Sequence, residues 1–124
     1  MVATPMAADR GRYMALVGLE VTDDASYARY RAGMTPILEA YGGSFGCDFV
    51  VAKVLKGPSE RLNRVFTITF PDRATQARFF ADTHYLEVRA AHFEGAVAKA
   101  VVLAEFVDDG SPHEPPANRP DPRR

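Results

Sequence analysis

The stretch Tyr13-Met-Ala-Leu-Val-Gly-Leu-Glu-Val21 alternates in the manner of a β-strand, and it is largely apolar on both of its sides. One side would carry Tyr13, Ala15, Val17, Leu19 and Val21, and the other Met14, Leu16, Gly18 and Glu20. Residues 96–106, the last strand-like stretch, are apolar on both sides as well. A strand with one solvated face would show a polar residue at every second position. These two strands therefore predict a sheet with both faces covered.

A helix is predicted to follow the first strand. Thr22-Asp23-Asp24 ends the strand and offers capping side chains. Apolar residues then recur every three or four positions, at Tyr27, Tyr30, Met34, Leu38 and Tyr41. Pro36 removes one backbone donor, so we expect a kink or a restart near Met34-Thr35. Gly42-Gly43 is predicted to end the helix, because glycine tolerates the left-handed conformation.

The second half of the chain repeats strand, helix and strand. Strands are expected over about residues 45–55, 64–70 and 96–106. Pro71-Asp72 stops the middle strand and caps a helix over 73–82, followed by a helical piece over about 85–93 that ends at Gly95. The buried side of the helix over 73–82 is predicted to consist of Ala74, Ala77, Phe80 and Ala81.

The order βαββαβ predicts an α+β fold of ferredoxin-like type, with a four-stranded antiparallel sheet and the helices on one face. The domain should cover residues 13–107. Residues 1–12 show no periodic pattern and are expected to be a flexible lead-in. The Pro-rich, charged tail at 108–124 has too little apolar area to fold and is expected to be disordered.

Composition excludes several classes of protein. With 124 residues, of which 47% are hydrophobic, the chain is large enough for one core. Its 15 basic and 16 acidic residues nearly balance and form no basic face, so we expect no nucleic-acid partner. No apolar run is long enough for a membrane or resembles a signal peptide, so a cytoplasmic location is expected. The single cysteine, Cys47, lies in the apolar context Phe45-Gly-Cys-Asp-Phe49 and is predicted to be buried or to have a packing role, against the alternative of a reactive thiol.

The uncovered face of the sheet predicts self-association. Both helices of the predicted fold lie on one face, so nothing in the chain covers the apolar side chains on the other. Leaving a large apolar side chain in water forgoes about 1.5–3 kcal/mol. A second copy of the sheet, related by a two-fold axis, is the simplest cover. We therefore expect a homodimer, against the alternative of a monomer with a mildly apolar open face.

Four motifs in order resemble the DUF1330 family: Val21-Thr-Asp-Asp-Ala-Ser-Tyr27-Ala-Arg-Tyr30, Tyr41-Gly-Gly43, Thr69-Phe-Pro-Asp72, and Phe79-Phe-Ala-Asp-Thr-His-Tyr85 with Arg89. The resemblance covers roughly residues 13–106. It implies a dimeric α/β barrel, in which the sheets of two ferredoxin-like protomers pack face to face. It implies no activity, because the wider superfamily contains cofactor-free monooxygenases, haem-degrading enzymes, muconolactone isomerases and stress-response proteins.

Polar residues gather at two places that could bind a small molecule. His84, Tyr85 and Arg89 could act on a carboxylate or enolate as general base, hydrogen-bond donor and charge clamp. Tyr27 and Tyr30 could line a pocket for an aromatic ligand, and Asp23 could touch that ligand. Each residue also has a structural interpretation: Arg89 could pair with an acid, the tyrosines could be core, and Asp23 could be a helix cap.

Neither a metal nor a cofactor is expected. His84 and His92 would lie about 12 Å apart along a helix, too far to share an ion. Three functions remain open on the sequence: a cofactor-free enzyme acting on a small aromatic or carboxylate-bearing metabolite, a non-catalytic protein that binds such a molecule, and a purely structural dimer.

Overall fold

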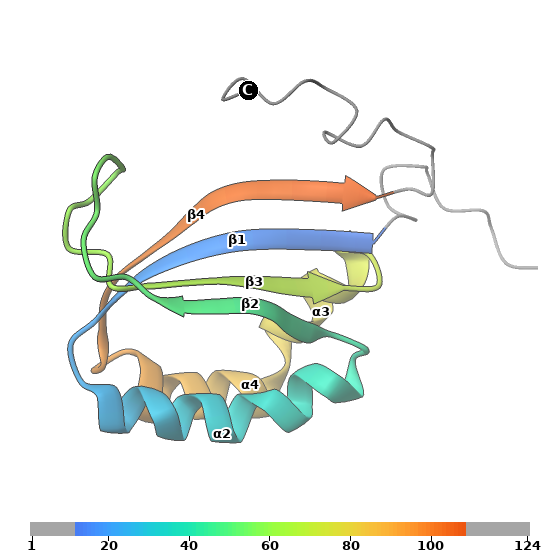
Figure 1. Ribbon diagram of the computed structural model, residues 1–124. Helices are drawn as coiled ribbons and strands as arrows, with labels where there is room; N and C mark the ends of the chain where they lie inside the picture. The colour runs from blue at the N-terminus through green and yellow to red at the C-terminus, as the bar shows by residue number, and fades with distance from the viewer. Residues whose placement is uncertain (1–11, 109–124) are drawn as a thin grey trace, which may run out of the picture.

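A computed structural model describes residues 12–108, which form two layers (Figure 1). In chain order the elements are β1 (Arg12–Val21), α2 (Asp24–Ala40), β2 (Ser44–Val50), β3 (Arg64–Phe70), α3 (Arg73–Ala81), α4 (Thr83–Val88), a π-helical segment (Arg89–Phe93) and β4 (Val97–Asp108). Most of the expected lead-in and tail lies outside the described residues. Within the described part, no helix has the length and apolar character needed to cross a membrane.

The four strands form one antiparallel sheet in the order β2-β3-β1-β4. Figure 1 shows all the helices on the same face of this sheet. The predicted ferredoxin-like α+β fold is therefore confirmed. Strands β1 and β4, the first and last in the chain, are neighbours in the sheet. They are also the two strands whose sequences are apolar on both sides.

The helix-facing side of the sheet forms the core. Register pairs Tyr13 with Phe70 and Ala15 with Ile68, and all four side chains are buried. The predicted stripe of α2 covers them, since Tyr27, Tyr30, Met34 and Leu38 are its buried residues. The alternation of β1 and the periodicity of α2 were thus sufficient to predict which residues meet.

The opposite side of the sheet is apolar, and the loop between β2 and β3 covers one part of it, where the buried Leu62 packs close to Gly18, while the rest is open within the described chain. Register places Met14 beside Phe106 and Leu16 beside Ala104 on this open face. Phe106 is 53% exposed and Leu103 is 36% exposed. Exposed side chains of this size on one continuous surface are typical of an interface.

Helix α2 runs as one helix from Asp24 to Ala40, so of the kink or restart expected near Met34-Thr35 the restart does not occur. Pro36 is exposed and deprives one carbonyl of its intrahelical partner at a place open to water. Buried side chains before and after it, Met34 and Leu38, hold both parts of the helix on the sheet. The helix ends as expected, with Gly42 at a φ of 79°.

Strand β2 ends at Val50, and not near residue 55 as the apolar run suggested. It is an edge strand, and its pairing with β3 shifts between Phe45 and Asp48. Cys47 lies at this irregularity with its backbone N–H donating to the Thr67 hydroxyl at 2.8 Å. Its side chain is exposed, which corrects the expectation of a buried thiol. Because β2 is an edge strand that pairs with a neighbour on one side only, the Cys47 side chain is left open to solvent.

Helix α3 buries a different side from the one predicted. Its buried residues are Thr75 and Phe79, whereas Ala74, Ala77 and Ala81 are exposed and Phe80 is half-buried. Asp72 begins this helix by accepting a hydrogen bond from the Thr75 N–H at 2.7 Å. Burial of the large Phe79 ring outweighs the close approach that a face of alanines would permit.

Candidate functional site

A cavity of about 180 Å³ lies between the helices and the sheet. Its wall is mostly apolar and comes from all four strands and the helical layer. The polar side chains that reach it are Tyr27, Tyr30, Arg31, Tyr85 and Arg89. Within the described chain, no Asp, Glu, His, Ser, Thr or Cys lines it. Every polar group of the wall is therefore an arginine or a phenol.

One end of the cavity is built around Arg89. Its Nη1 donates to the Tyr85 hydroxyl at 3.2 Å, and that hydroxyl is 2.8 Å from the hydroxyl of Tyr30. The guanidinium also lies 4.6 Å from the centre of the Phe93 ring. Among the residues that the structure describes, no carboxylate forms an ion pair with Arg89. This half-buried charge is thus held by a hydroxyl and an aromatic ring.

The local chain conformation directs these groups inward. Asp82 caps α4 by accepting from the Tyr85 N–H at 2.9 Å, and its other oxygen accepts from the Tyr41 hydroxyl at 2.8 Å. Arg89 then begins the π-helical segment, where the Glu94 N–H donates to the Arg89 carbonyl at 3.2 Å. π-Helical turns inside helices are frequent at functional sites. The sequence predicted the helix but not this widened turn.

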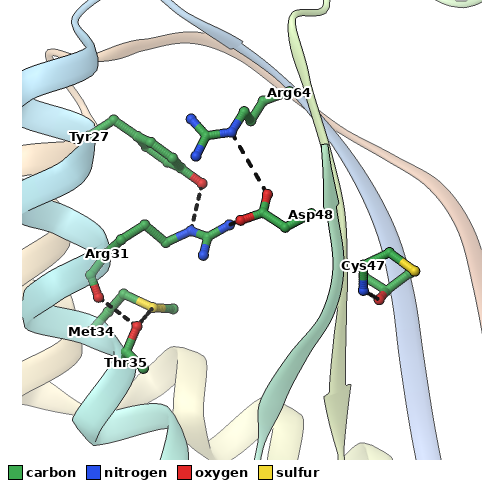
Figure 2. A network of polar contacts seen from close by, with 8 residues as sticks. Tyr27, Arg31, Met34, Thr35, Cys47, Asp48 and Arg64 are labelled. Carbon is green, nitrogen blue, oxygen red and sulfur yellow. Dashed lines mark hydrogen bonds and ion pairs between the residues drawn. The ribbon is translucent and has the colours of Figure 1, made fainter. Parts of the chain in front are cut away.

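The other polar part of the cavity is built around Arg31, one turn after Tyr27 on α2. Its Nε donates to the Tyr27 hydroxyl at 2.9 Å, and its Nη2 is 2.9 Å from Asp48 (Figure 2). Asp48 also lies 3.7 Å from Nε of Arg64, so one carboxylate serves two arginines. The guanidinium of Arg31 stacks 3.8 Å from the centre of the Phe45 ring.

The same figure places Cys47 on the far side of β2 from Asp48, away from this network. Successive residues of a strand point to opposite faces, which explains why only one of these neighbours reaches the arginines. Cys47 therefore has no part in the cavity.

Burial raises the pKa of two tyrosines of the cavity, Tyr30 and Tyr27. It raises the pKa of the Tyr30 phenol, and the neighbouring Tyr85 raises it further. Burial also raises the pKa of Tyr27, with Arg31 opposing the change. Both side chains therefore remain hydroxyl groups at neutral pH, able to donate as well as accept.

The structure brings four of the six candidate residues to the cavity: Tyr27, Tyr30, Tyr85 and Arg89. His84 is exposed and is not part of the wall. Asp23 also lies outside it and caps α2, accepting from the Ser26 N–H at 3.0 Å. Asp23 could contact a ligand or cap a helix, and its observed hydrogen bond is that of a helix cap.

Sequence reasoning missed the network of Arg31, Asp48 and Arg64. The spacing of Tyr27 and Arg31 places both on one face of a helix and could have indicated their contact. Asp48 and Arg64 gave no such signal, because their meeting depends on how β2 pairs with β3. No group of three or more His, Cys, Asp or Glu within residues 12–108 is arranged to hold a metal ion.

Three solved structures show the same fold at low sequence identity. A protein of unknown function from Rhodopseudomonas palustris has a TM-score of 0.71 and 21% identity, covering 86% of this chain and 85% of its own. A dabb family protein with a ferredoxin-like fold from Mesorhizobium loti has a TM-score of 0.58 and 17% identity, covering 78% and 96%. A dimeric ferredoxin-like protein of unknown function from Jannaschia sp. CCS1 has a TM-score of 0.50 and 18% identity, covering 77% and 98%.

No curated protein matches the sequence. The family model described as "Domain of unknown function (DUF1330)" matches residues 13–106, which is nearly the whole described domain. Its match agrees with the resemblance carried by the four motifs. The chain therefore belongs to the DUF1330 family.

Proposed function

We propose that the protein binds a small carboxylate- or enolate-bearing molecule in the cavity of each protomer. The observation that carries this proposal is the Arg89 guanidinium, which reaches the cavity without a carboxylate partner in the described chain. A guanidinium matches the geometry of a carboxylate, and the surrounding apolar wall strengthens the attraction by excluding water. A mostly apolar pocket with a few converging polar groups is typical of a small-molecule site.

A cofactor-free enzyme is the second candidate, favoured by the position of the Tyr30 and Tyr85 hydroxyls next to Arg89. Donors gathered at one point would stabilise negative charge as it develops on a substrate oxygen. In this mechanism Arg89 holds the charge and Tyr85 donates a hydrogen bond. The exposed position of His84 supplies no support for its expected role as general base.

We also propose that the protein is a cytoplasmic homodimer, formed through the open face of the sheet. The exposed Phe106 and Leu103 support this assembly, as does the dimeric protein of the same fold from Jannaschia sp. CCS1. The helices and the cavity lie on the opposite face, so each protomer would keep its own site. A dimer without a ligand remains the third possibility.

The test of binding is native mass spectrometry of the purified full chain, followed by identification of any retained small molecule. Arg89→Gln should lose that molecule, because it removes the charge that holds the anion. The matched control is Arg29→Gln, which changes an exposed arginine on α2 and should retain it. Equal retention by both variants would refute the role of Arg89. A molecule that is recovered chemically changed favours the enzyme, and one recovered unchanged favours binding alone.

The test of assembly is light scattering coupled to size exclusion at micromolar concentration. The wild type should have the mass of two chains, and Phe106→Glu should shift it to one by placing a charge in the interface. Leu86→Glu is the matched control, because Leu86 is 47% exposed on the helical layer. A wild type with the mass of a single chain would contradict the dimer.

A further inference from the structure

We infer that the cavity selects an acid with a single six-membered ring and one carboxylate, whose carboxylate lies against Arg89 and the two tyrosine hydroxyls. This inference rests on the proposed function and narrows it to one class of ligand. Three independent features of the cavity carry it: its volume, the balance of its charges, and the number of hydroxyl protons available at one end.

The volume sets the size of the ligand. The cavity measures about 180 Å³. An apolar cavity of about 150 Å³ in another protein holds one benzene molecule, and the share of one water in the liquid is about 30 Å³. The space in this protein therefore matches one ring and a small substituent. A second fused ring would exceed this volume.

The charges set the number of carboxylates. Arg31 is already paired with Asp48 at 2.9 Å and bonded to the Tyr27 hydroxyl, whereas Arg89 has no acid partner in the described chain. One anionic group can therefore be paired without breaking an existing bond. A second carboxylate would have to displace Asp48 or remain unpaired against an apolar wall, which is unfavourable. A cationic ligand would meet arginine and no acid.

The hydroxyl protons set the chemistry of the group next to Arg89. Tyr30 and Tyr85 carry two protons, and their mutual contact at 2.8 Å uses one of them. Arg89 donates to Tyr85 and can accept nothing in return. One proton of the pair is therefore left for a ligand oxygen, whichever hydroxyl donates to the other. Together with the N–H groups of Arg89, this end of the cavity offers more donors than acceptors, so it favours a ligand group that accepts.

This proton count predicts an unusual result for mutations. Removing either hydroxyl abolishes the mutual contact, so the remaining hydroxyl still has one proton for the ligand. Removing both leaves none. Tyr30→Phe and Tyr85→Phe should each weaken binding by less than about threefold, and the double variant by about tenfold or more, the effect of losing a hydrogen bond to a charged group.

Titrations of the full chain, followed by NMR or calorimetry, test the ligand class directly. Benzoate should bind, with shifts at the amides of Arg89 and Phe93. 1-Naphthoate, the dianion phthalate and the neutral benzamide should each bind at least about tenfold more weakly, for reasons of size, charge and lost ion pairing respectively. Tyr13→Phe is the control for the phenol variants, because the Tyr13 hydroxyl bonds Glu105 and lies outside the cavity wall.

The outcomes separate this inference from the function on which it rests. If 1-naphthoate or phthalate binds as tightly as benzoate and Arg89→Gln abolishes that binding, the ligand class is wrong and the anion site stands. Additive losses in the double variant would overturn the proton count. If no carboxylate binds and Arg89→Gln keeps the retained molecule, both proposals fail. Should the double variant not fold, the ligand series on the wild type still decides.

Discussion

Arg31 and Arg89 reach the same cavity from opposite helical segments, but their charges are balanced differently. Arg31 is only 18% exposed and is held by Asp48, by the Tyr27 hydroxyl and by the Phe45 ring. Arg89 is held by the Tyr85 hydroxyl and the Phe93 ring, with no acid paired to it in the described chain. A buried guanidinium with a carboxylate is a complete structural unit, whereas one without it has capacity left for a ligand. The comparison therefore separates an arginine that stabilises the fold from one that serves the site.

The largest expected effect is on stability, at the Arg31 end. Asp48→Ala should lower the free energy of unfolding by about 2 kcal/mol. This value lies between the cost of breaking a buried ion pair and that of breaking an exposed one, because the Asp48 side chain is 33% exposed. The variant leaves Arg31 and Arg64 without their shared carboxylate. Denaturant unfolding measures the change, and Glu60→Ala, at an exposed acid in the loop before β3, is the control. Equal stability of the two variants would mean that Arg31 needs no counter-charge.

Arg89→Leu should have a smaller effect on the same measurement, below about 1 kcal/mol. The variant loses the hydrogen bond to the Tyr85 hydroxyl and the contact with the Phe93 ring, the latter worth about 0.5–1 kcal/mol at an exposed site. It also removes a half-buried charge that no carboxylate balances, and this gain opposes the loss of the two contacts. The matched substitution is Arg31→Leu, which should destabilise more because it leaves Asp48 with Arg64 alone. A larger loss for Arg89→Leu would reverse the assignment of the two arginines.

The fold was more predictable than the site for a physical reason. The positions of Tyr13, Tyr27 and Phe70 follow from periods of two and 3.6 residues that run over whole elements, so the sequence contained the pattern repeatedly. The ends of the cavity depend on single contacts between distant segments, such as Arg31 with Asp48. No period encodes such a contact.

The pair Tyr85 and Arg89 was predicted because both residues belong to one helix turn. Their spacing of four residues places them on the same face, and the structure joins them at 3.2 Å. Tyr30 comes from α2, and its meeting with Tyr85 required the packing of two helices. The burial of Phe79 in place of the alanines of α3 shows the same limit, since the size of one ring decided the orientation.

The smallest expected effect concerns Asp82, which positions the Arg89 end without touching the cavity. The hydrogen bond from the Tyr85 N–H, helped by that from the Tyr41 hydroxyl, lowers the pKa of Asp82. A lowered carboxyl pKa contributes stability above the unfolded value of about 4, and this contribution is lost as the pH falls through the folded value. At pH 7 the Asp82→Asn variant should therefore unfold at a slightly lower temperature than the wild type, since asparagine still caps a helix but carries no charge.

The difference between Asp82→Asn and the wild type should shrink as the pH falls below about 4, because protonation then removes the charge from the wild type as well. Thermal unfolding at pH 7 and pH 3 measures this convergence. The control is Glu87→Gln, which removes a negative charge from the same helix without touching the cap. It shows whether an effect comes from the charge at the cap or from the change in net charge alone. A difference that persists unchanged at pH 3 would mean that the Asp82 carboxylate does not hold α4. The Arg89 end would then owe its geometry to the packing of Tyr85 and Phe79, whose ring centres lie 4.5 Å apart.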